Sequence, residues 1–119
     1  MTTRQNRVRE LLKIEISDII HRELKDPRLG FITITDVEIT GDLRYASVFV
    51  SIMGTEKERA GNLAMLKRAV HFIRGSLGKR ISMKVLPEIE FKLDTSVDHA
   101  IRMLELMEQI KHDEEKRSP

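Results

Sequence analysis

The sequence contains no cysteine and no tryptophan, and its only aromatic residues are four phenylalanines and one tyrosine. Without cysteine there can be no disulfide, thiolate nucleophile or cysteine-liganded zinc site. No apolar run approaches the length of a membrane span, and the polar N-terminus lacks the pattern of a signal peptide. With 119 residues the chain is long enough for one domain and too short for two. We therefore expect a soluble cytoplasmic protein with an aliphatic core.

Acidic residues are also absent from one long stretch, residues 59–87, although the whole protein carries a net charge of only +2. The rest of the chain must therefore sum to −5. Like charges repel one another and weaken the folded state unless a polyanion binds to them, so the stretch indicates a nucleic-acid partner. Its seven cations are Arg59, Lys67, Arg68, Arg74, Lys79, Arg80 and Lys84.

Within this basic stretch the apolar residues follow helical spacing, from Leu63 and Leu66 to Val70, Ile73 and Leu77. This pattern predicts one buried helix face. A second set with the same spacing, Lys67, His71 and Arg74, predicts a stripe of cations on another face. Because aromatic rings are scarce, we expect contact to phosphate, sugar and overall shape rather than stacking of single bases.

Three elements are predicted before the basic stretch. Helical periodicity runs over residues 6–24, and the Asp26-Pro27 step ends it because proline disfavours a helical residue before it. Residues 31–40 predict a strand whose two apolar pairs are out of phase, so we expect a bulge near Thr35-Asp36. Residues 45–53 alternate as a second strand, and the short turn between the two makes an antiparallel hairpin.

The remaining pattern predicts a helix after Thr55, a strand and a last helix. Thr55 and Glu58 have the spacing of a capping box, and the glycines at 75 and 78 predict a break in the helix that follows. Alternation from Met83 to Leu93 predicts a strand parallel to the second one, interrupted by Pro87. Residues 97–110 predict a helix, and the polar residues 111–119 predict a disordered tail.

The sequence shows no constellation of catalytic residues. It has no Walker-type phosphate loop, HExxH, GxSxG or GxGxxG motif, and its four histidines lie on separate elements without metal-ligand spacing. We predict neither an enzyme nor a bound metal or cofactor. The literal GxxG at Gly75–Gly78 is a weak sign of an RNA-binding KH domain, because Gly78 as the C-terminal cap of a helix is the better interpretation.

The order α-β-β-α-α-β, together with several local strings, resembles the ribosome-binding factor A family of bacterial maturation factors for the small ribosomal subunit. The likeness extends over about residues 7–110. The short sequence segments that carry it are Lys25-Asp26-Pro27-Arg28-Leu29-Gly30, Asp42-Leu43 with Ala46 and Val48, Phe72-Ile73-Arg74 with Leu77-Gly78, and Pro87-Glu88-Ile89 with Phe91, Asp94 and Ser96. It implies an α+β fold of KH type II, with residues 1–95 as an RNA-binding core, a three-stranded mixed sheet and a C-terminal helix at residues 96–110.

The resemblance also implies a function and a site. A member of this family binds the free immature 30S subunit as a monomer, contacts 16S rRNA with small-subunit proteins nearby, and supports late folding and 5′-end processing of that RNA, notably in the cold. The family's interrupted helix, Ala-x-Gly before Phe-Ile-Arg, corresponds here to Ala69, Val70 and His71, with His71 in place of the usual glycine. The seven cations named above are the candidate RNA contacts, with Arg4, Arg7 and Arg28 as further candidates.

A different class of function stays open at this point. The basic face could bind an acidic protein instead of RNA. Binding to RNA should weaken steeply with ionic strength and disappear after nuclease treatment, whereas binding to a protein should survive the nuclease.

Overall fold

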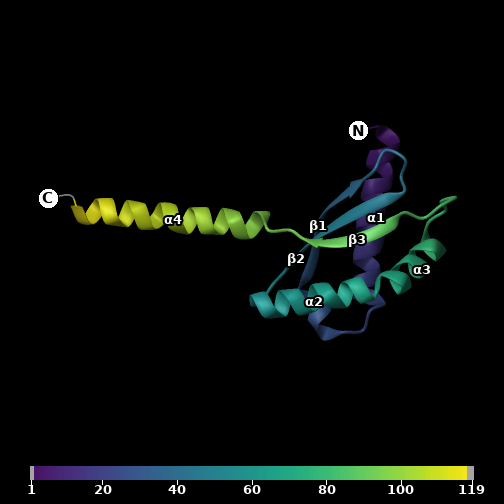
Figure 1. Cartoon of the computed structure of the whole chain (residues 1–119), viewed down its shortest axis with the longest axis horizontal. Coiled ribbons are helices and arrows are strands. Elements are labelled where there is room, and N and C mark those ends of the chain that lie inside the picture. Colours follow the sequence, from purple (N-terminus) through teal and green to yellow (C-terminus); the bar gives the residue numbers. More distant parts are fainter. Residues whose placement is uncertain (1, 118–119) are drawn as a thin grey trace.

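The computed structural model describes residues 2–117, apart from the side chains of residues 30, 97–100, 102–103 and 113–117. Within these residues the sheet has three strands. In Figure 1 helices cover one of its faces, and a long helix extends away from it. In this described part, the helices are α1 (Thr3–Arg22), α2 (Glu56–Arg68), α3 (Val70–Arg80) and α4 (Ser96–Arg117), with a 3-10 turn at Pro27–Phe31. The strands are β1 (Ile32–Ile39), β2 (Tyr45–Ile52) and β3 (Glu88–Leu93).

The sheet has the order β1-β2-β3, with β1 antiparallel and β3 parallel to the central strand β2. This arrangement confirms the expected α+β fold with a mixed sheet. The register of β1 against β2 shifts between Ile34 and Asp36, which is the bulge that the two out-of-phase apolar pairs predicted. The extra residue, Thr35, donates its hydroxyl hydrogen to Asp94 at the end of β3, with 2.5 Å between the two oxygens.

The core lies between the sheet and helices α1, α2 and α3. Alternate residues of β2, from Ala46 to Ile52, point into it, as the alternation predicted. Phe91 is the largest fully buried side chain among the described residues, and α1 contributes an aliphatic stripe to the same core. The buried apolar residues on α1, α2 and α3 are Leu12, Ile16, Ile19, Ile20, Leu66, Ile73 and Leu77.

The third strand is shorter than its sequence pattern predicted. Alternation begins at Met83, but β3 begins only at Glu88, and Val85 is 61% exposed. The carbonyl oxygens of Leu86 and Pro87 accept hydrogen bonds from the Arg74 side chain, and proline has no N–H to donate to a neighbouring strand. Residues 83–87 therefore form a connection along α3.

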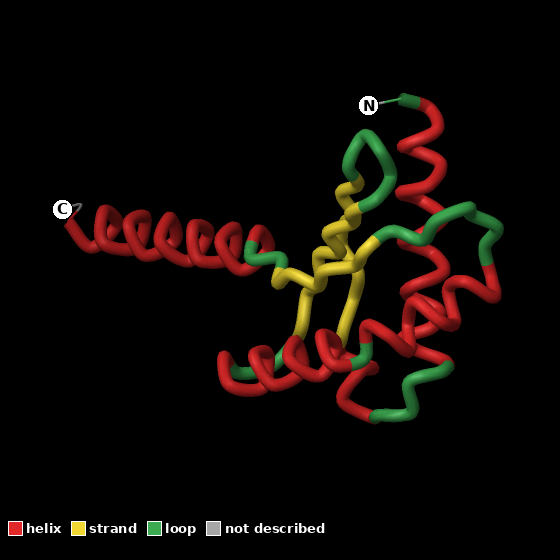
Figure 2. The backbone as a smooth tube through the Cα atoms, turned by 45° about the vertical axis from the view of Figure 1, so that its right-hand side comes forward, coloured by secondary structure: helices red, strands yellow, loops and turns green. Residues whose placement is uncertain are grey.

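Helix α4 projects from the end of β3 and away from the other elements, as the two views of Figures 1 and 2 agree. Its apolar side chains at Ile101, Leu104 and Ile110 are exposed. The helix continues to Arg117, so the disordered tail expected for residues 111–119 is wrong up to that residue, and residues 118–119 lie outside the described part. Lysine, arginine and glutamate have high helix propensity, so this polar segment can extend a helix without a core. None of the described helices combines the length and the apolarity needed to cross a membrane.

Candidate nucleic-acid interface

The central helical segment breaks at one residue, Ala69, between α2 and α3 (Figure 2). Ala69 has φ −87° and ψ 1°, outside helical values, and its N–H is shared between the carbonyl oxygens of Met65 and Leu66 at 3.1 Å each. The break lets Leu66 on one side and Ile73 on the other both become fully buried. The bend thus lies in the expected segment, although position 71 is histidine rather than glycine.

The expected break at Gly75–Gly78 is wrong, because α3 runs through both glycines and ends at Arg80. A Cβ atom at Gly78 would lie 3.2 Å from Leu86 Cδ1, whereas one at Gly75 would meet open space. Gly78 therefore allows the α3–β3 connection to lie close against the helix. The literal GxxG is a packing feature of a continuous helix, and Gly78 does not close it.

Four cations of the basic stretch are exposed, and we call them the outer cations: Lys67, Arg68, Lys79 and Lys84. Within the described part of the chain, their side chains form no ion pair or hydrogen bond. Lys67 and Arg68 occupy the last turn of α2 and Lys79 the last turn of α3, where the helix dipole favours positive charge. These four charges are available to a polyanion.

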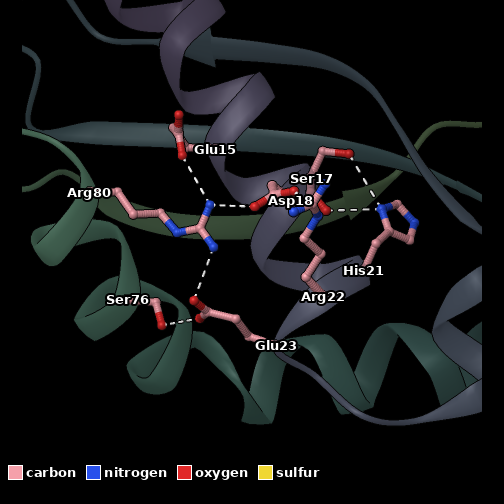
Figure 3. A network of polar contacts seen from close by, with 8 residues as sticks. All are labelled: Glu15, Ser17, Asp18, His21, Arg22, Glu23, Ser76 and Arg80. Carbon is pink, nitrogen blue, oxygen red and sulfur yellow. Dashed lines mark hydrogen bonds and ion pairs between the residues drawn. The ribbon is translucent and has the colours of Figure 1, made fainter.

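Arg80, next to Lys79, has a different environment (Figure 3). Its guanidinium donates to three carboxylates of α1 or its C-cap, with N–O distances of 3.1 Å to Glu15, 2.6 Å to Asp18 and 3.0 Å to Glu23. Ser76, one turn earlier on α3, donates a further hydrogen bond to Glu23. Arg80 thus joins α3 to α1, and its charge is compensated within the protein.

The same contacts shift the pKa values of the groups involved. The hydrogen bond from Arg80 lowers the pKa of Asp18, and hydrogen bonds from Ser76 and Arg80 lower that of Glu23. In return, the hydrogen bonds to Asp18, Glu23 and Glu15 raise the pKa of Arg80. Asp18, Glu23 and Arg80 are therefore charged near neutral pH, and their contacts hold α3 to α1 rather than supplying a proton donor or acceptor.

Arg74 is also held inside the fold. Its Nε donates to the Pro87 carbonyl at 3.1 Å and its Nη2 to the Leu86 carbonyl at 3.2 Å, with Glu88 3.9 Å from Nη1. The stripe expected from Lys67, His71 and Arg74 therefore keeps only its first two members on the surface, because Arg74 turns toward the α3–β3 connection. We refer to Arg74 and Arg80 together as the anchored arginines.

The other candidate residues divide in a similar way. Arg28 forms a two-pronged ion pair with Asp26, at 3.1 and 2.8 Å, and this pair lowers the pKa of Asp26. Arg59 lies half-buried in the first turns of α2. Arg4 and Arg7 are exposed in the first turns of α1, apart in sequence from the basic stretch.

The sequence contains a signal for the role of Arg80 that the basic stretch alone does not give. Glu15 and Asp18 are three residues apart, which places an acidic stripe on one face of α1, and Glu23 follows at the C-cap of that helix. An acidic stripe on one helix and a basic stretch elsewhere in the chain predict at least one ion pair between them. Net charge alone could not show which cation would form it.

The candidate site is the bent helix pair α2–α3. The outer cations are exposed on both helices and on the connection after α3, and the anchored arginines are bonded to other parts of the fold. This arrangement can bind phosphate groups on an extended or curved backbone. No group of three or more histidine, aspartate or glutamate side chains in the described part of the chain is placed to hold a metal ion.

Comparisons with known proteins give this arrangement a context. The family model described as ribosome-binding factor A matches residues 4–107. A ribosome-binding factor A from Halothermothrix orenii is 51% identical over 112 residues, which cover 94% of this chain and 92% of that protein. The crystal structure of ribosome-binding factor A from Thermus thermophilus matches with a TM-score of 0.66 and 30% identity, over 75% of this chain and 94% of that one.

A third match concerns a complex. Coordinates of the Thermus thermophilus factor fitted into a cryo-EM map of its complex with the 30S subunit match with a TM-score of 0.62 and 31% identity. They cover 73% of this chain and 91% of that one.

Proposed function

Because the chain belongs to the ribosome-binding factor A family, we propose that it binds the free immature 30S subunit in the cytoplasm and supports late folding and processing of 16S rRNA. Its role is binding rather than catalysis, it acts as a monomer when free, and it works through a KH-type helical surface. Loss of the protein should impair maturation of the 5′ end of 16S rRNA and growth in the cold.

One observation carries this proposal. The outer cations, Lys67, Arg68, Lys79 and Lys84, are exposed and without partners in the described part of the chain, on or beside the bent helix pair α2–α3. The helix dipole stabilises some of these charges only slightly, whereas each phosphate that they neutralise releases counterions and favours binding. The Thermus thermophilus match to a 30S complex supports the same partner.

Salt dependence provides the test. If about five phosphates are neutralised, the logarithm of the affinity for purified 30S subunits should fall with the logarithm of salt concentration with a slope of roughly −3.5 to −4.5. Lys67→Glu should reduce both affinity and slope. The control is Lys92→Glu, on the face of the sheet that the helices do not cover, which should leave both unchanged.

Two outcomes would contradict the proposal. A flat salt response would exclude phosphate contacts as the main source of affinity. Binding in a lysate that survives complete nuclease digestion, with an acidic protein retained, would favour the alternative of a protein-interaction domain. Sedimentation of the protein with free small subunits, lost on nuclease treatment, is the result that we expect.

A further inference from the structure

A cavity of about 440 Å³ lies at the opposite end of the sheet from α4. Three parts of the chain form its walls: the first turns of α1, the turn between β1 and β2, and the connection between α3 and β3. Its volume is within the range that encloses small molecules. Three of its lining residues are cations, Arg4, Arg44 and Lys84. Five are apolar and form what we call the apolar wall: Val8, Leu11, Leu43, Met83 and Val85.

The cavity carries a positive charge that the protein itself does not neutralise. Arg4, Arg44 and Lys84 are exposed, and in the described part of the chain their side chains form no ion pair. Asp42 is the only carboxylate among the lining residues. It already accepts hydrogen bonds from the Thr40 hydroxyl at 2.7 Å and the Arg44 backbone N–H at 3.1 Å, which lower its pKa.

The apolar wall is unusual in two respects. Leu43 has φ +61°, a left-handed conformation that leucine rarely adopts, and the turn is closed by its N–H donating to the Thr40 carbonyl at 2.9 Å. Val85 is 61% exposed even though the strand pattern predicted burial. Backbone conformations of this kind cluster at ligand sites, and here the strained leucine and the exposed valine line the same cavity.

We propose that this cavity takes a single unpaired RNA nucleotide, with its phosphate among Arg4, Arg44 and Lys84 and its base against Leu43 and Val85. A bare phosphate would leave the apolar wall unused, and a duplex could not present one base to a cavity of this size. Unpaired nucleotides combine an anion with an apolar ring face, and proteins hold such rings on guanidinium planes and between apolar side chains as well as on aromatic ones. The inference rests on the proposed function and adds to it a contact that selects single-stranded over double-stranded rRNA. It departs from the expectation that single bases are not contacted, because the aliphatic lining of the cavity takes the place of the scarce aromatic rings.

The first experiment maps the site on the full chain labelled with ¹⁵N. Adenosine 5′-monophosphate and uridine 5′-monophosphate should shift the amide signals of Leu43, Arg44 and residues 82–85. Inorganic phosphate and adenosine without phosphate should each shift them less. Hexaglutamate is the probe for an acidic peptide, and shifts caused by it and not by either nucleotide would overturn the proposal in favour of a protein ligand.

The second experiment measures the affinity for a fluorescent hexauridylate and for an RNA hairpin without unpaired overhangs. Leu43→Gly removes the leucine side chain from the apolar wall and suits the left-handed backbone, so it should not unfold the protein. This variant and Val85→Gln should each weaken hexauridylate binding by about fivefold, which corresponds to a loss of about 1 kcal/mol. Met53→Gln, a change at an exposed apolar residue outside the cavity, is the matched control and should have no effect.

These results separate the two proposals. If Leu43→Gly and Val85→Gln bind hexauridylate as tightly as the unaltered protein while Lys67→Glu still weakens 30S binding, the cavity proposal is wrong and the proposed function stands. If the unaltered protein binds no RNA and no subunit, the proposed function fails and the cavity proposal fails with it.

Discussion

Lys79 and Arg80 are neighbours in the sequence and belong to two different regions of the molecule. Lys79 is exposed among the outer cations, whereas Arg80 turns to α1 and donates to Glu15, Asp18 and Glu23. In a helix, consecutive residues point about 100° apart, so one can face a neighbouring helix while the next faces solvent. A stretch of like charge therefore cannot be treated as one surface. The carboxylates of α1 and its C-cap bind the Arg80 guanidinium, so that charge is not available to a ligand.

The largest effect should come from reversing the charge of Arg80. Arg80→Glu would place a fourth carboxylate among three, and we expect the greatest loss of thermal stability of any single charge reversal in residues 59–87. Lys79→Glu should change the free energy of unfolding by no more than about 0.5 kcal/mol, as exposed substitutions generally do. Thermal unfolding followed by circular dichroism measures both. Equal destabilisation by the two variants would show that the Arg80 contacts do not hold α3 to α1.

Acid should weaken the α1–α3 junction in a predictable pH range. The pKa values of Asp18 and Glu23 are lowered by folding from their ordinary values near 3.8 and 4.5, so their contribution to stability is complete above those values. It is lost as the pH falls below about 4.5 toward the lowered values. Thermal unfolding between pH 6 and pH 3 should therefore show a smaller fall in melting temperature for Arg80→Gln than for the unaltered protein.

The acid dependence should not vanish in that variant. The pKa values of Asp26, Asp42 and Asp94 are also lowered by their own hydrogen bonds, which Arg80→Gln leaves in place. An identical pH dependence in both proteins would contradict a role for the junction.

A smaller effect tests whether Lys79 and Arg80 belong to one continuous helix. Gly75→Ala should stabilise the protein by about 0.5–1 kcal/mol, because alanine is the better helix former and its Cβ would meet open space. At Gly78 the new Cβ would lie 3.2 Å from Leu86 Cδ1, so Gly78→Ala should gain less or destabilise. Urea unfolding of the pair provides the comparison. Destabilisation by Gly75→Ala would indicate that the GxxG segment is not helical in solution.

The smallest effect on stability should come from deleting α4. The core of the sheet and the α1–α3 junction stabilise the domain. The described apolar side chains of α4, such as Leu104 and Met107, are exposed and add little to it. Removing residues 97–119 keeps Ser96, whose N–H and hydroxyl donate to Asp94. The melting temperature should be unchanged, and a clear fall would mean that α4 packs on the core in solution.

Much of the fold could be predicted because its signals are local. The phase change between Ile34 and Val37 predicted the bulge, since a strand must keep one face buried. The capping box at Thr55 and Glu58 predicted the start of α2, and both of its hydrogen bonds are present. The bend at Ala69 came from the family resemblance, and burial of Leu66 and Ile73 on both sides of it supplies the physical reason.

The features that could not be predicted depend on contacts between distant parts of the chain. From sequence alone, Gly78 is typical of a helix end, whereas in the structure it makes room for Leu86 inside a continuous helix. Val85 continues a strand pattern, whereas in the structure the carbonyl group of the next residue accepts a hydrogen bond from Arg74. The site shows the same limit. Lys79 and Arg80 are equivalent in charge and neighbours in sequence, and only the position of α1 separates a candidate RNA contact from a structural residue.

The central claim is that RNA contact belongs to the outer cations and not to the anchored arginines. The most direct test is the salt dependence of 30S binding for Lys79→Gln and Arg80→Gln, both assayed at a temperature where circular dichroism shows them folded. We predict that Lys79→Gln reduces the slope of log affinity against log salt by about 1, as expected for the loss of one phosphate contact, and that Arg80→Gln leaves the slope unchanged. A reduced slope for Arg80→Gln together with an unchanged slope for Lys79→Gln would contradict the claim.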